Sequence, residues 1–245
     1  MGNFLSFEEI QNKCEQLNEV YQIDEEKFFQ IAEKWADSEV SIEKKLVASF
    51  SELLQIVSDE ISGMEAAVDM KPTCGLGCAF CCYFPIIINE MEAKLMKKAI
   101  KNFPDERREE LQAHFTKYFE QYGEKLDQIT ALDFEADGDF KYTYKMSQVP
   151  CIMLNTETNQ CMAYEIRPIP CRTYVNYTDP KVCEQNPMPK ETISFEFLYR
   201  EYMGALNEFV QFLYDQGDTA FIHYPDDIYR HDYLPNWFRS YERIT

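Results

Sequence analysis

Eight cysteines between Cys74 and Cys183 are the residues of this sequence whose type and spacing can do chemistry. Four of them fall within nine residues, and the rest follow between residues 151 and 183. Thiols in a reducing compartment seldom form structural disulfides, so a dense array there is more often a metal site. An odd total of nine cysteines also fits a disulfide framework poorly. We therefore expect eight metal ligands: Cys74, Cys78, Cys81, Cys82, Cys151, Cys161, Cys171 and Cys183.

The first group has the sequence Cys-Gly-Leu-Gly-Cys-Ala-Phe-Cys-Cys over residues 74–82. Its two glycines, Gly75 and Gly77, allow a tight backbone whose N–H groups can point at sulfur. Structural zinc usually uses paired two-residue knuckles, and here only Cys78 and Cys81 have that spacing. The compact loop is closer to iron–sulfur usage, with zinc as the alternative. We expect the neighbouring side chains of Cys81 and Cys82 to point apart, towards different metals or opposite sides of one multinuclear centre.

The second group is predicted to be brought together by a β-hairpin and a proline-rich turn. Apolar residues 151–154 and 161–164 flank a polar segment, which is a hairpin signature, and three prolines at 168, 170 and 180 predict irregular structure around Cys171. Arg167 and Arg172 lie beside this turn, where guanidinium groups would offset the negative charge of clustered thiolates. The alternative for both arginines is a surface ion pair with one of the many acids.

The overall charge restricts the classes of partner. The formal net charge is −19, from 24 Lys+Arg and 43 Asp+Glu, and such a field repels phosphate backbones and anionic lipid headgroups. We therefore expect neither nucleic acid nor a membrane as partner, and no apolar stretch approaches the ~20 residues needed to span a bilayer. The segment 1–11 carries Glu8 and Glu9 where a secreted chain would have a basic start and an apolar run, so the expected location is cytoplasmic.

The sequence predicts an α+β fold that is mainly helical, with a small β-hairpin region completing a cysteine-rich metal centre. Ser6 with Glu9 and Asn89 with Glu92 have the spacing of capping boxes. Three regions are expected: a helical N-terminal region (1–70), a metal-binding domain (71–190), and a C-terminal helix with an aromatic-rich tail packed on the same body (191–245). Further helices are predicted over 25–36, from about 42, from 89 to about 102, over 104–129 and over 194–214. A short strand or extended lead-in is predicted at 86–88. β-Structure is predicted from 140, where Phe140, Tyr142 and Tyr144 alternate with polar residues.

The cysteine segments resemble the YkgJ-like cysteine-cluster family, which is described as a zinc- or iron-chelating domain. The resemblance covers about residues 71–183 and includes a specific Tyr-x-x-Arg-Pro-x-x-Cys-Arg element over 164–172. The flagellin lysine methylases look like distant members, thought to combine an iron–sulfur cluster with S-adenosylmethionine. For this chain the resemblance implies that activity by analogy only.

Another template fits the first loop in part. Residues 74–81 match the three-cysteine loop of radical S-adenosylmethionine enzymes, including the aromatic Phe80 before the last cysteine. Those enzymes place the loop after a strand and continue with strand–helix repeats, whereas a long predicted helix precedes this loop. Five further cysteines are also outside that template, so it is the less favoured interpretation.

Three functional classes follow from these residues. The leading one is a metal-binding protein that holds an iron–sulfur cluster or Zn²⁺ through the eight cysteines. The second is a cluster-dependent enzyme, methyltransferase-like or redox, whose organic substrate or cofactor would lie beside the centre near Tyr164, Arg167 and Arg172. The third is a non-catalytic metal carrier or interaction module whose acidic surface contacts a protein partner. His223, Asp226, Asp227 and His231 form a looser group among aromatic residues, which favours packing over function.

Cys14 is expected to be structural, because it lies on a helical stripe with Ile10, Leu17 and Tyr21. The substitution Cys14→Ser should therefore leave the metal content unchanged when metal per chain is measured by elemental analysis. Loss of metal in this variant would contradict the assignment.

Overall fold

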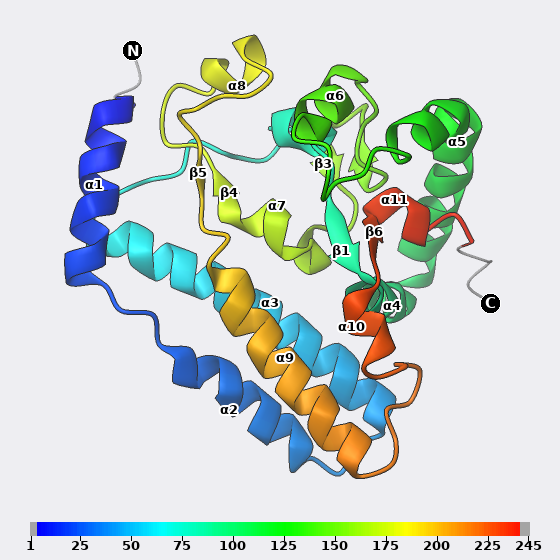
Figure 1. The fold of residues 1–245 in the computed structure, drawn as a ribbon. Coiled ribbons are helices and arrows are strands. Elements are labelled where there is room, and N and C mark those ends of the chain that lie inside the picture. The colour runs from blue at the N-terminus through cyan, green and yellow to red at the C-terminus, as the bar shows by residue number, and fades with distance from the viewer. Residues whose placement is uncertain (1–3, 241–245) are drawn as a thin grey trace. The chain divides into compact units, whose positions relative to one another are not determined.

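The computed structural model describes residues 4–240, which are mainly helical and carry small antiparallel two-stranded sheets, so the predicted α+β class is confirmed (Figure 1). The chain divides into two compact units, each assembled from separated segments. Unit 1 combines residues 4–75 with 167–224, and unit 2 combines residues 76–166 with 225–240. These units cut across the three consecutive regions expected from the sequence.

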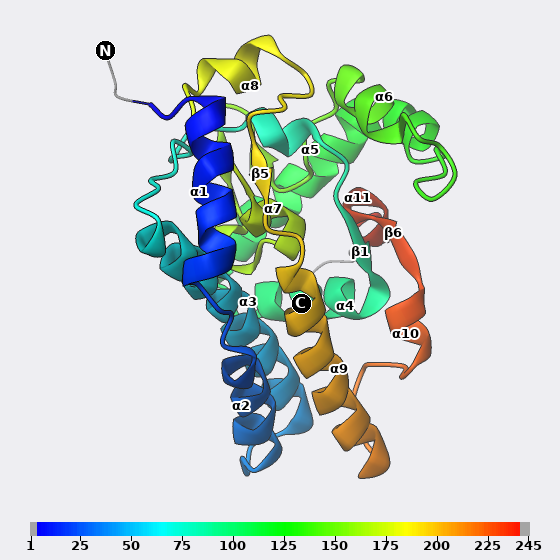
Figure 2. The same ribbon diagram turned by 60° about the vertical axis from the view of Figure 1, so that its left-hand side comes forward.

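Unit 1 is a helical layer with one small sheet. Helices α2, α3 and α9 pack side by side, and α1 contacts α3 (Figure 1 and Figure 2). The sheet pairs β4 with β5 in antiparallel register, Tyr174 opposite Ser194. Its elements are α1 Phe7–Val20, α2 Glu25–Ala36, α3 Ile42–Ala67, α7 Ile169–Thr173, β4 Tyr174–Val175, α8 Lys181–Gln185, β5 Ile193–Ser194 and α9 Leu198–Asp215.

The predicted apolar face of α3 is the core of unit 1. Its residues recur at helical spacing and are almost fully buried: Leu46, Phe50, Leu53, Leu54, Val57 and Ile61. Glu60 on the same helix is 1% exposed, and it accepts hydrogen bonds from Tyr21 Oη and Lys27 Nζ. A buried carboxylate needs such partners, so this pair of contacts ties α3 to the segment around α1 and α2.

Local sequence signals explain where the helices begin. Ser6 and Glu9 form a reciprocal capping box at α1, as predicted, and α2 has the predicted bounds. In unit 2, Asn89 and Glu92 form the second predicted capping box at the start of α4. Pro104 is the N-cap of α5, which ends at Ile129 as expected.

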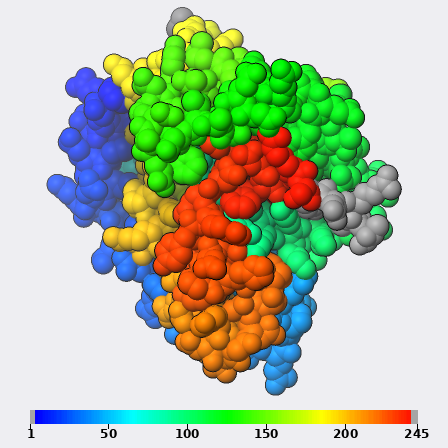
Figure 3. Space-filling view, turned by 45° about the vertical axis from the view of Figure 1, so that its right-hand side comes forward, coloured from blue at the N-terminus to red at the C-terminus, as the bar shows by residue number. Residues whose placement is uncertain are grey.

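Unit 2 is built on a two-stranded antiparallel sheet that joins distant parts of the chain. Strand β1, the predicted strand near residue 87, pairs with β6 so that Ile87 lies opposite Tyr233. Figure 3 shows the C-terminal segment, in red, lying directly against the green helical part of this unit. The elements are the 3-10 helix η1 Phe80–Tyr83, β1 Ile87–Asn89, α4 Glu90–Lys101, α5 Asp105–Ile129, α6 Phe140–Met146, β2 Leu154–Asn155, β3 Gln160–Cys161, the 3-10 helix η2 Tyr164–Ile166, α10 Asp226–Tyr229, β6 His231–Tyr233 and α11 Leu234–Trp237.

The β-structure predicted from residue 140 is wrong, because Phe140–Met146 is the helix α6. Aromatic residues at 140 and 144 also lie on one face of a helix, four residues apart. Tyr144 is 2% exposed and stacks on Tyr233 with ring centroids 5.6 Å apart, whereas Tyr142 is 50% exposed. The packing of Tyr144 on Tyr233 therefore determines the local structure, and the alternation of aromatic and polar residues does not.

Two further expectations need correction in unit 1. Pro168 and Pro170 do not leave the chain irregular, because Pro168 is the N-cap of α7 and Pro170 occupies its first turn, where proline is tolerated. The predicted helix 194–214 begins only at Leu198, because Ser194 pairs in β5. Strand pairing with a segment twenty residues earlier is not visible in local spacing.

None of the helices in residues 4–240 has both the length and the apolar character needed to cross a lipid bilayer.

The buried capping box of α4 yields a stability prediction. Asn89 is fully buried, and its side chain accepts the Glu92 N–H at 2.8 Å. The substitution Asn89→Ala should lower the free energy of unfolding by about 1–2 kcal/mol, measured by urea denaturation, because the helix loses its cap. The matched control is Ser6→Ala at the exposed capping box of α1, for which we expect a smaller loss. An equal or smaller effect at Asn89 would contradict the prediction.

Candidate metal centre

The first cysteine loop passes from one unit to the other between Gly75 and Leu76. Cys74 is exposed on unit 1, and Cys78 is partly buried in unit 2. Gly77 has φ of +87°, a backbone conformation that glycine adopts without steric cost, so the expected tight turn is present at this glycine. The loop is therefore shaped by its sequence at one position, while its ends are held by different units.

Cys81 and Cys82 lie in the 3-10 helix η1, whose backbone bonds run from Cys82 N to Ala79 O and from Phe84 N to Cys81 O, both at 3.0 Å. The two thiols are hydrogen-bonded to each other, so the expectation that they point apart is wrong. Successive side chains in a 3-10 helix are separated by about 120° rather than the half-turn of a strand. This geometry allows the side chains of Cys81 and Cys82 to bind the same metal centre.

The predicted hairpin is confirmed as β2 paired with β3, with Leu154 opposite Cys161, and is shorter than expected. Its first cysteine is held to the first loop, because Cys151 N–H donates to the Cys82 carbonyl at 2.6 Å. Helix α5 supports the same segment: Tyr118 Oη donates to Pro150 O at 2.8 Å, and a ring nitrogen of His114 lies 2.8 Å from Ile152 O. Unit 2 thus fixes the backbones of its cysteine segments next to one another.

Cys74 is joined to a polar residue that the sequence analysis missed. The Asn176 N–H points at Cys74 Sγ with an N–S distance of 3.3 Å. Asn176 is 2% exposed, and its carbonyl accepts from Thr73 N at 2.8 Å. Hydrogen bonds from backbone N–H groups to sulfur stabilise the anionic form of a ligand. Nothing in the local sequence marks Asn176, because its partners Thr73 and Cys74 are about a hundred positions away.

Cys171 and Cys183 lie in unit 1, in the short helices α7 and α8. Arg172 is 8% exposed, and it donates from Nε to Arg167 O at 2.8 Å and from Nη1 to Ser58 Oγ at 2.6 Å. This burial is incompatible with a surface ion pair for Arg172, and the bond to Ser58 ties α7 to α3. Tyr164 lies in unit 2 and is 56% exposed. A role of these three residues towards a ligand stays a prediction.

The electrostatics of unit 2 distinguish its thiols. A hydrogen bond from the Cys82 side chain holds the pKa of Cys81 below its ordinary value, and the positive charge of Lys145 acts in the same direction. Burial raises the pKa of Cys151 to about 12, and the charges of Cys161 and Cys81 add to this effect. Of these two thiols, Cys81 is the better prepared to lose its proton, and Cys151 needs a metal to do so.

The donor chemistry fits a zinc or iron centre. All nine cysteines are thiols, and thiolates are the preferred ligands of both structural zinc and iron–sulfur clusters. The structure brings Cys78, Cys81, Cys82, Cys151 and Cys161 into one unit, where they influence one another electrostatically. Within residues 4–240, however, no three or more Cys, His, Asp or Glu side chains are already arranged to hold a metal ion. Side-chain rearrangement would have to accompany binding, and the eight-ligand set stays a prediction.

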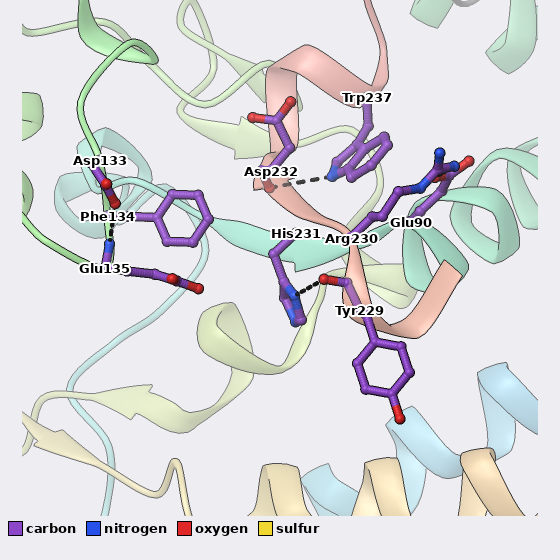
Figure 4. Close-up of a pocket in the computed structure, with 9 residues that line it drawn as sticks. All are labelled: Glu90, Asp133, Phe134, Glu135, Tyr229, Arg230, His231, Asp232 and Trp237. Carbon is purple, nitrogen blue, oxygen red and sulfur yellow. Dashed lines mark hydrogen bonds and ion pairs between the residues drawn. The ribbon is translucent and has the colours of Figure 1, made fainter. Parts of the chain in front are cut away.

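The looser group of His and Asp residues is not one site within a unit. His223 belongs to unit 1, whereas Asp226, Asp227 and His231 belong to unit 2. Asp227 is fully buried and pairs with Lys94 at 2.7 Å, and the His231 ring lies 3.2 Å from Tyr229 O. A pocket of about 630 Å³ opens beside this segment (Figure 4), lined by Glu90, Asp133, Phe134, Glu135, Tyr229, Arg230, His231, Asp232 and Trp237. Its lining contains no cysteine.

The cysteine segments match one known family model. Residues 73–193 match the family model CxxCxxCC, described as "Putative zinc- or iron-chelating domain". Searches of curated proteins and of solved structures gave no match. The matched segment contains all eight cysteines of the predicted ligand set.

The opposite pKa shifts of Cys81 and Cys151 yield a reactivity prediction. In metal-free, reduced protein at pH 8, Cys81 should react with iodoacetamide at least about ten times faster than Cys151, because only the thiolate is nucleophilic. Raising the pH towards 10 should leave Cys151 largely protonated and slow to react, because its pKa is about 12. Mass spectrometry of peptides gives each rate.

The same labelling in urea is the control, since unfolding should equalise the two rates. Equal rates in the native protein, or faster labelling of Cys151, would contradict the electrostatic account.

Proposed function

We propose, from the match of residues 73–193 to the CxxCxxCC model of a zinc- or iron-chelating domain, that the eight cysteines from Cys74 to Cys183 hold an iron–sulfur cluster or Zn²⁺. The iron–sulfur cluster is the preferred cofactor. The proposed location is cytoplasmic, where reducing conditions keep thiols available as ligands.

The observation that carries this proposal is the connection between the two cysteine groups in unit 2. The Cys151 N–H donates to the Cys82 carbonyl, and Cys82 in turn is hydrogen-bonded to Cys81. These residues are about seventy positions apart in sequence, so nothing local requires them to meet. Their juxtaposition supports a shared ligand set for the cysteines of unit 2 rather than independent thiols.

The cysteines of unit 1 are proposed as the remaining ligands. Cys74 already accepts a backbone N–H from Asn176, which favours its thiolate. Cys171 lies one residue before Arg172 in α7, and Cys183 lies in α8. We propose that the guanidinium groups of Arg167 and Arg172, with Tyr164, lie near the loaded centre and offset its negative charge.

The preference for an iron–sulfur cluster rests on the first loop. Cys81 and Cys82 are adjacent in a 3-10 turn and hydrogen-bonded to each other. Two thiols placed in this way suit a multinuclear centre, in which they can bind neighbouring metal ions. A mononuclear zinc site needs four thiolates arranged as a tetrahedron, and only Cys78 and Cys81 have the usual knuckle spacing. Zinc remains the alternative that the experiment below separates.

The acidic composition bears on partners. A net charge of −19 supports a protein partner with a basic surface rather than nucleic acid or an anionic membrane. Metal ions are the partner that the family itself implies.

The test is metal and sulfide analysis of protein purified without oxygen. We expect iron with acid-labile sulfide in stoichiometric amounts, and loss of most of it in Cys81→Ser and Cys151→Ser, because each removes a ligand from the connected group. Zinc without acid-labile sulfide would show that Zn²⁺ is the cofactor.

Cys14→Ser is the matched control, since it removes a thiol outside the matched segment. Absence of both metals from the purified protein and after reconstitution, or identical metal content in all three variants, would contradict the proposed function.

A further inference from the structure

Lys145 is a buried cation beside the cysteine loop of unit 2. It is the second-to-last residue of α6 and is 7% exposed. Lysine is almost never buried so deeply unless its ammonium group is paired. Here Nζ donates to the carbonyl of Phe80, the residue directly before Cys81, and lies 4.4 Å from the centre of the Phe84 ring. The ammonium group is therefore held against the segment that carries Cys81 and Cys82.

The orientation of α6 is fixed independently of this contact. Tyr144, the preceding residue, is buried and stacks on Tyr233 of β6 with an angle of 9° between the rings. The Lys145 carbonyl accepts a hydrogen bond from Gln148 Nε2 at 2.9 Å. Since one face of the helix is locked against the sheet, the next side chain along is directed at the loop. Sequence analysis gave no sign of this, because the segment was expected to be extended.

The Lys145 ammonium group is placed next to the cysteine turn by its hydrogen bond to the Phe80 carbonyl, one residue before Cys81. A ring face also attracts the ammonium group, since Nζ lies 5.9 Å from the centre of the Tyr83 ring as well. Carbonyl, rings and thiols together form the environment that keeps the cation at this place.

Charge balance on metal binding shows what such a cation does. When four thiols bind one divalent metal ion, four S–H bonds break, four protons go to solvent, and four metal–sulfur bonds form. The site changes from neutral to a net charge of −2. A nearby positive charge stabilises the anionic product more than the neutral thiols, so it favours loading.

We propose that Lys145 is a positioning residue of the metal centre, whose buried ammonium group orders the Phe80–Tyr83 turn and stabilises the negatively charged, metal-loaded thiolates. The proposal rests on the proposed function and adds to it a group outside the cysteine set. It predicts that Lys145 influences the affinity for metal without being a ligand.

The experiment compares Lys145→Met, Lys145→Arg and Lys141→Met with the unsubstituted chain. Lys141 is a matched control, because it lies on the same helix, is exposed, and carries the same charge. Zn²⁺ affinity is measured by competition with a chelator, and Co²⁺ substitution reports the number of thiolates bound through its sulfur-to-cobalt absorption. Far-UV circular dichroism and thermal melting of the metal-free proteins report folding.

We expect Lys145→Met to weaken Zn²⁺ binding by about tenfold or more, because the anionic site loses a buried cation beside the cysteine turn. The Co²⁺ spectrum should keep its intensity at saturation, which shows that the ligands are intact. Lys145→Arg should restore most of the affinity, and Lys141→Met should bind like the unsubstituted chain.

Equal affinity of Lys145→Met and the unsubstituted chain would overturn the proposal, and so would equal weakening by Lys141→Met. If Lys145→Met does not fold, Lys145→Arg decides: affinity within about threefold of the unsubstituted chain supports the proposal, and a larger loss in a folded Lys145→Arg protein overturns it. Failure of the unsubstituted chain to bind Zn²⁺ or iron at all would instead contradict the proposed function, so the two failures are distinguishable.

Discussion

Thiolates that lie close together repel one another, and the organisation of the cysteine segments follows from the need to compensate this repulsion. Five thiols share unit 2, where burial and then the charges of Cys161 and Cys81 raise the pKa of Cys151. The Cys82–Cys81 hydrogen bond, the buried Lys145 and, in unit 1, the Asn176 N–H on Cys74 each favour negative charge on sulfur. A metal ion supplies the remaining positive charge, and without it a deeply buried thiol such as Cys151 stays protonated.

The same constraint explains why regular helices anchor irregular ligand segments. Cys81 and Cys82 lie in a 3-10 turn, Cys161 in a strand of the short hairpin, and Cys171 and Cys183 in two short helices. Longer helices hold these segments: Tyr118 of α5 donates to the Pro150 carbonyl, and Ser58 of α3 accepts from the Arg172 side chain.

Local rules predicted the elements that depend on local interactions. Both capping boxes, the bounds of α2, the buried face of α3 and the hairpin around Leu154 and Cys161 follow from residues within a few positions of one another. The helix α6 could not be predicted in this way, because the stacking of Tyr144 on Tyr233 joins residues far apart in sequence. Lys145 and Asn176 escaped notice for the same reason. The assignment of eight ligands came from residue type and spacing, and the family match supports its chemistry while leaving its geometry as a prediction.

The central claim is that a metal centre is held by cysteine sulfur, and X-ray absorption at the edge of the bound metal tests it most directly. We expect sulfur as the nearest neighbour of the metal, at about 2.3 Å in the case of zinc, with an additional iron neighbour if a cluster is present. Nearest neighbours that are mainly nitrogen or oxygen, at about 2.0–2.2 Å, would contradict the account.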